Sequence, residues 1–105
     1  MLISHILTIF EAMLNGKSIA VVLPAYNAAE TLEKTYNEIP QDIVDAVILV
    51  DDASKDETSM KAKALGITHL IRHKSNRGYG GNQKSCYKKA LELNSDIIIM
   101  LHADY

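Results

Sequence analysis

Apolar and polar positions alternate along the chain in blocks that predict a regular series of strands and helices. Strands are predicted at about residues 19–23, 46–50, 69–72 and 97–101. Helical spacing of apolar side chains predicts intervening helices at about residues 28–38, 55–65 and 82–93. Three of the strands are continuously apolar, which is typical of a parallel sheet covered on both faces. With right-handed crossovers, this order predicts an α/β fold: a doubly wound, mostly parallel sheet with helices on both faces.

A separate amphipathic helix is predicted over residues 1–16, ahead of a domain at residues 17–105. Its apolar positions recur at helical spacing and are Leu2, Ile3, Ile6, Leu7, Phe10, Met13 and Leu14. Such a helix packs on the domain, on a further copy of the chain, or on a membrane surface, although its polar face carries no Lys or Arg. The segment has no basic region and no cleavage site, so a secretory signal is not predicted. We therefore expect a cytoplasmic location, or one at the cytoplasmic face of a membrane.

Composition and charge narrow the functional classes. The 105 residues suit one soluble domain, with 48% hydrophobic and 23% charged residues, and the net charge of -2 argues against nucleic-acid binding. The charge is uneven: residues 72–89 hold six Lys or Arg and no acid, while residues 42–57 hold six acids and one Lys. These are either two solvated faces or a phosphate-attracting segment opposite a metal-attracting one. The single cysteine, Cys86, excludes an internal disulfide and is predicted to be a buried, inert thiol.

Three polar clusters follow the continuously apolar strands, at residues 24–27, 51–54 and 102–104. The carboxyl ends of parallel strands share one edge of a sheet, and ligands bind there, so the clusters are expected to converge. Carboxylates beside a phosphate-binding element suggest a divalent metal and a nucleotide. Tyr26, in the first cluster, could line a nucleobase pocket.

Asp51 and Asp52 form an adjacent pair after the second strand. Successive side chains of a strand point in opposite directions, so the two carboxylates are expected to have different roles. One would face the edge and accept hydrogen bonds from a ribose or base, and the other would cap the helix that begins near Ser54. The alternative is that both act only as helix caps.

Asp104 lies at the mouth of the last buried strand, where a hard oxygen ligand suits Mg²⁺ or Mn²⁺. His102 lies two residues earlier, on the same face if the strand persists. It would ligate the metal, bind a phosphate, or be a structural group.

Residues 76–82 form a glycine-rich stretch ahead of a predicted helix. Glycines such as Gly78 permit positive φ angles, and a helix start near Asn82 would attract phosphate. An ordinary turn explains the stretch equally well.

Taken together, four segments resemble the nucleotide-binding half of a family 2 glycosyltransferase with the Rossmann-like GT-A fold, near the dolichyl-phosphate mannose synthase-like branch. They are VVLPAYNAAETL, ILVDDASKDET, NRGYGGNQKS and IIIMLHADY, within residues 19–105. The resemblance implies inverting transfer of a sugar from a nucleotide diphosphate sugar, such as a UDP- or GDP-sugar, with Mg²⁺ or Mn²⁺. The acceptor would be a lipid phosphate, a glycan or a protein.

The resemblance also implies roles for individual residues. The nucleoside would contact Pro24, Ala25 and Tyr26. Asp52 would bind the base or ribose, with Asp51 secondary to it. The stretch from Gly78 to Asn82 would flank the donor, and Asp104 would be the last acid of the metal-binding D-x-D motif.

The chain departs from the family pattern at two positions. His102 replaces the first acid of that motif, and Ala28 replaces an acid that many relatives carry. The family's catalytic base lies in a C-terminal half, so none is assigned, and we expect a truncated domain that is inactive alone.

Two other classes compete with this interpretation. ILVDDAS resembles the acidic pair of a receiver-like phosphoacceptor domain, with Asp104 as acceptor. A non-catalytic nucleotide-binding or assembly module would instead associate through the N-terminal helix, independently of metal.

Overall fold

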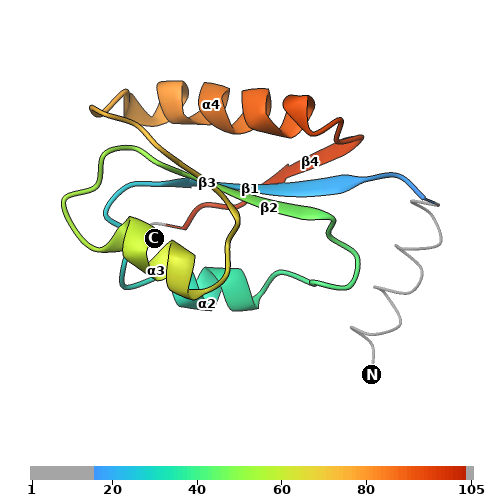
Figure 1. The fold of residues 1–105 in the computed structure, drawn as a ribbon, viewed down its shortest axis with the longest axis horizontal. Helices are drawn as coiled ribbons and strands as arrows, with labels where there is room; N and C mark the ends of the chain where they lie inside the picture. The colour runs from blue at the N-terminus through green and yellow to red at the C-terminus, as the bar shows by residue number, and fades with distance from the viewer. Residues whose placement is uncertain (1–15, 104–105) are drawn as a thin grey trace.

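A computed structural model describes residues 16–103 as a four-stranded parallel sheet between two layers of helices (Figure 1). The strands are β1 (Ile19–Ala25), β2 (Ala46–Asp51), β3 (His69–Arg72) and β4 (Ile97–Met100). The helices are α2 (Leu32–Asn37), α3 (Thr58–Ala64) and α4 (Gly78–Glu92). Figure 1 shows α4 on one face of the sheet and α2 and α3 on the other, which confirms the doubly wound α/β prediction. The predicted N-terminal helix lies outside the described residues, apart from Gly16.

The strand order is β3-β2-β1-β4. The chain winds outward from β1 to β3 and then crosses back to place β4 on the free side of β1, as in one half of a Rossmann sheet. In the receiver-like order the third strand lies beside the first, whereas here β3 pairs only with β2 among the described strands. The topology therefore argues against a receiver domain, and it puts the point where the winding direction reverses between β1 and β4.

The continuously apolar strands contribute side chains to two hydrophobic cores, one on each face of the sheet. Alternate residues of β1, such as Val21 and Leu23, pack toward the α2 and α3 layer. Ala20 and Val22 face the other way and pack with Cys86 and other residues of α4. Burial raises the pKa of the Cys86 thiol to about 12, which confirms that this cysteine is buried and makes it a poor nucleophile.

Helix boundaries differ from the prediction, because polar side chains at the sheet edge bond across the structure. The helices predicted at residues 28–38 and 55–65 would start directly after Asn27 and Ser54. Instead the backbone amide of Asn27 donates to Ser54 Oγ at 2.8 Å, and the backbone amide of Lys55 donates to Asn27 Oδ1 at 2.9 Å. The two loops are thereby tied together, and α2 and α3 begin four and three residues later than the predicted starts at residues 28 and 55. No helix in the described part of the chain is long and apolar enough to span a bilayer.

Candidate functional site

A cavity of about 310 Å³ opens at the carboxyl edge of the sheet, where β1 and β2 end beneath the first turns of α4. Its lining residues are Pro24, Ala25, Tyr26, Asp52, Asn76, Gly78, Tyr79 and Asn82. Six of the seven residues predicted to bind the donor therefore lie around one cavity, although they come from three separate segments. Parallel pairing of β1 with β2 produces this convergence, since it brings Ala25 level with Asp51.

Asp52 caps α4 from a distant part of the chain. Its carboxylate is buried, with Oδ1 accepting from the Arg77 amide at 2.7 Å and Oδ2 accepting from the Gly78 amide at 2.9 Å. Gly78 adopts a φ of +79°, which glycine permits without steric cost. This remote cap explains why α4 begins four residues earlier than predicted, and it occupies amides that were expected to face a phosphate.

His73 makes a third bond to the same carboxylate. Its Nδ1 lies 2.8 Å from Asp52 Oδ1, and its Nε2 lies 2.7 Å from the hydroxyl of Ser85. An ionised carboxylate only accepts hydrogen bonds, so Nδ1 carries a proton. A carboxylate has about four lone-pair sites, and these three bonds leave one for a donor group of a ligand in the cavity.

Burial by itself would raise the pKa of Asp52, but the hydrogen bonds outweigh it. The His73 imidazole, the amides of Arg77 and Gly78, and the attraction of the imidazole together hold the pKa of this carboxyl below its ordinary value of 3.8. Asp52 is therefore a fixed negative charge at neutral pH, oriented by the fold before any ligand arrives.

This lowered pKa makes the stability of the fold depend on pH in a defined direction. The folded state holds the ionised form more strongly than the unfolded chain, so the contribution of Asp52 is complete above the ordinary pKa and is lost in more acidic solution. We expect the stability difference between wild type and Asp52→Asn to be largest at neutral pH and to shrink below about pH 4. Urea unfolding at several pH values measures it, and a difference that grows on acidification would contradict the assignment.

Asp51 lies outside the cavity and organises the loop after β2. This carboxylate is fully buried, accepting from the amide of Ser54 at 2.9 Å, from Arg72 Nη1 at 2.6 Å and from the hydroxyl of Ser59. The two adjacent acids thus point in different directions, as the strand geometry predicted. Only Asp52 reaches the cavity.

Ala53, between Asp52 and Ser54, has a left-handed backbone with a φ of +60°. This conformation costs a non-glycine residue about 1–2 kcal/mol. Glycine adopts this conformation without that cost, but it loses more conformational entropy than alanine on folding. The first effect is the larger in free energy, so we expect Ala53→Gly to stabilise the protein by about 0.5–1 kcal/mol in urea unfolding. Ala64→Gly, at the end of α3, is the matched control and should destabilise by about 1 kcal/mol. Equal destabilisation by both changes would refute the strain.

Asn82 clamps the ends of two strands from within α4. Its side chain is buried, and Nδ2 donates to the carbonyl oxygens of Val50 at 3.0 Å and Ala25 at 3.3 Å. These carbonyls lie at the ends of β2 and β1, and the Ala25 oxygen also accepts from the backbone amide of Asp52 at 2.9 Å. Asn82 therefore holds the floor of the cavity in place.

Tyr79 and His102 lie in contact on the β4 side of the cavity. The Tyr79 hydroxyl is 3.0 Å from Nε2 of His102, and the ring centroids are 5.2 Å apart. His102 follows β4, so a residue that lines the cavity touches one of the two predicted metal ligands. Asp104, the other, lies outside the described residues, and among residues 16–103 no three His, Cys, Asp or Glu side chains form a metal-binding group.

Three residues at the site were not predicted from the sequence: His73, Asn76 and Tyr79. The signal for His73 was present, because it follows β3 as Asp52 follows β2, and Arg72 is paired with Asp51 in the sheet. Applying the strand-end rule to the short third strand would have found it. Asn76 and Tyr79 lie in the glycine-rich stretch, and its glycine pattern predicts backbone contacts but no role for these two side chains.

The strand order and the cavity at the carboxyl edge of the sheet are those of an α/β domain of the Rossmann type. The family model for glycosyl transferase family 2 matches residues 20–105. The chain therefore belongs to glycosyl transferase family 2, which confirms the resemblance of its four motifs.

Two relatives with known names are similar to this chain over most of its length. The chain is 32% identical to the UDP-N-acetylglucosamine--dolichyl-phosphate N-acetylglucosaminyltransferase of Methanococcus voltae, over 84% of this chain and 41% of that protein. It is 28% identical to glucosyl-3-phosphoglycerate synthase of Mycobacterium tuberculosis, over 90% of this chain and 31% of that protein.

A solved structure of that synthase in complex with Mn²⁺ and UDP-glucose superposes with a TM-score of 0.76 at 27% identity. The match covers 92% of this chain and 36% of the other. The chain thus spans less than half the length of these relatives.

Proposed function

We propose that this chain supplies the donor-binding part of an inverting glycosyltransferase that takes a sugar from a uridine diphosphate sugar. The observation that carries the proposal is the buried, pre-oriented carboxylate of Asp52 in a cavity with Tyr26. One carboxylate site remains for an N–H of the base or a ribose hydroxyl, while the exposed Tyr26 ring offers an aromatic surface for the base. The names of two relatives specify UDP-sugars, and this supports uridine over guanosine as the nucleoside of the donor proposed here.

The diphosphate would extend from this cavity toward Tyr79 and the end of β4. This direction is favoured because the two amides at the start of α4 are already bonded to Asp52 and because His102 lies beside Tyr79. His102 and Asp104 would hold Mg²⁺ or Mn²⁺ there, with diphosphate oxygens and water completing an oxygen-rich ligand set. A bound cation would neutralise the negative charge that builds on the departing diphosphate.

The acceptor proposed for the whole enzyme is a molecule that carries a phosphate. The curated relatives support this class, since their names specify dolichyl phosphate and 3-phosphoglycerate. A cytoplasmic location, or one at the cytoplasmic membrane face, would give access to both kinds of acceptor. Membrane contact or self-association through residues 1–16 stays a prediction.

Calorimetric titration tests the donor proposal. We expect UDP to bind more tightly than GDP, and Mn²⁺ to strengthen UDP binding by about tenfold or more, as expected for one charge-assisted interaction. Asp104→Ala should remove the effect of Mn²⁺, whereas Asp42→Ala, which removes an exposed acid far from the cavity, should not. Metal-independent self-association without nucleotide binding would instead favour the assembly-module alternative.

A further inference from the structure

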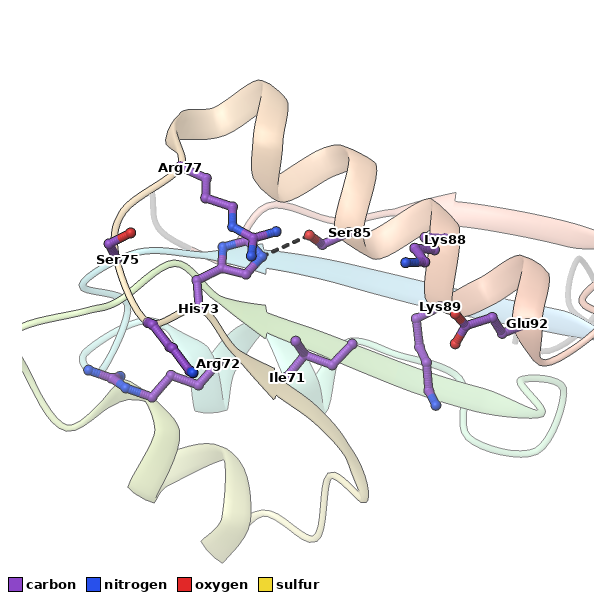
Figure 2. A pocket seen from close by; sticks show the side chains of 10 residues that line it. Ile71, Arg72, His73, Ser75, Arg77, Ser85, Lys88, Lys89 and Glu92 are labelled. Carbon is purple, nitrogen blue, oxygen red and sulfur yellow. Dashed lines mark hydrogen bonds between the residues drawn. The ribbon is translucent and has the colours of Figure 1, made fainter.

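A second hollow lies on the other side of His73, between the edge strand β3 and α4 (Figure 2). Its volume is about 510 Å³, larger than that of the cavity around Tyr26. The charged residues that line this basic groove are Arg72, Lys74, Arg77, Lys88, Lys89 and Glu92. Five cations therefore surround one hollow together with a single carboxylate, in a chain whose net charge is -2.

Most of these cations have no carboxylate partner among residues 16–103. Arg72 is bonded to Asp51, but no carboxylate oxygen of residues 16–103 lies within 4.0 Å of the charged groups of Lys74, Arg77, Lys88 or Lys89. Like charges held around one hollow repel each other, and a bound anion would relieve this repulsion. The basic segment is therefore more than a solvated face of the protein. Its cations come from the loop after β3 and from α4, and they line the same hollow.

The floor of the groove is rigid and polar. Ser85 lies on the groove side of α4, and its hydroxyl is bonded to His73, a residue only 4% exposed. Figure 2 shows Arg77 reaching from the start of α4 toward the His73–Ser85 pair, with Lys88 further along the same helix. Guanidinium, ammonium and hydroxyl groups around a fixed floor are the donors that proteins use to bind phosphate.

We propose that the basic groove binds a phosphate-bearing anion, at a site separate from the donor cavity. The two hollows share no lining residue, and the buried Asp52–His73 pair lies between them. The groove follows β3, at the opposite edge of the described sheet from β4 and His102. An anion bound there would therefore lie away from the end of the site where sugar transfer is proposed, and it would be neither the donor nor the acceptor.

The phosphate could belong to a soluble compound or to a lipid headgroup, and one experiment separates these sources. Inorganic pyrophosphate is titrated into the full chain without metal while amide shifts are followed by NMR. Vesicles of phosphatidylcholine, with and without phosphatidylglycerol, are tested in parallel by co-sedimentation. Saturable shifts at Lys74, Ser75, Ser85 and Lys88 would support a soluble ligand, and binding only to phosphatidylglycerol vesicles would support a headgroup.

Charge-reversal variants assign the binding to the groove. Lys88→Glu is expected to weaken binding by about tenfold or more, as is Lys74→Glu, which provides a second test on the loop. Lys63→Glu makes the same charge change on α3, across the sheet, and should leave binding within about twofold, the size of a screened surface effect. Equal loss in Lys63→Glu, shifts centred on Tyr26 and Tyr79, or no binding of either probe would overturn the proposal.

Discussion

Replacing Asp52 by alanine is expected to weaken UDP binding by about 10- to 100-fold. The variant loses a charged hydrogen-bond acceptor that faces the cavity, and bonds to ionised groups are worth about 1.5–3 kcal/mol. It also frees the Arg77 amide and leaves the Gly78 amide bonded only to Asn76, so the start of α4 loses its tie to the end of β2. Calorimetry in the presence of Mn²⁺, at a temperature where both proteins are folded, measures the change.

Asp56 provides the matched control. Its carboxylate accepts from the Thr58 amide at 3.0 Å at the start of α3 and from the Ala29 amide at 3.1 Å, but it does not line the cavity. Asp56→Ala should therefore cost about 1 kcal/mol of stability, as for other helix caps, with UDP affinity preserved. Undiminished affinity in Asp52→Ala, or equal loss in both variants, would remove Asp52 from the binding site.

The largest stability effect is expected for Asn82→Asp, at roughly 3 kcal/mol or more. Asn82 donates to two strand-end carbonyls from a buried position, and a carboxylate in its place cannot donate to them. Each carbonyl would lose the hydrogen bond from Asn82, and a negative charge would face the buried oxygens; the second change is the more costly. Urea unfolding followed by circular dichroism measures the free energy of unfolding, and raising the acidity should partly rescue the variant by protonating it.

Asn37→Asp makes the same chemical change at an exposed position near the end of α2. Substitutions at such positions usually shift stability by less than about 0.5 kcal/mol. A similar small effect at Asn82 would mean that its amide does not hold the ends of β1 and β2. A large loss at Asn82 alone would support the clamp and explain how α4 and the sheet form one cavity wall.

The adjacent acids Asp51 and Asp52 show how the site is divided between support and binding. The Asp51 carboxylate accepts hydrogen bonds from Arg72 and from the Ser54 amide, and so it supports the loop after β2. Asp52 is instead oriented toward the cavity by its hydrogen bond to the start of α4. His73 joins the two halves of this arrangement by fixing Asp52 on one side and meeting Ser85 on the other. The same imidazole thus lies between the cavity around Tyr26 and the basic groove.

Much of the architecture was determined by local sequence pattern. Continuous apolar runs located β1, β2 and β4, since a strand covered by helices on both faces has no polar face. Because parallel strands end at a common edge, the same runs predicted that Tyr26 and Asp52 would meet. Strand alternation also predicted that Asp51 and Asp52 would point apart.

Tertiary structure alone decided the start of α4, the hydrogen-bond partners of His73 and the existence of the basic groove. Each depends on contacts between residues far apart in the chain: the Asp52 carboxylate caps a helix that begins 26 residues later. A local pattern records which residues are buried or helical, but such bonds form only after the sheet has set its register. The sequence therefore determined where the strands end, and folding determined which polar groups meet there.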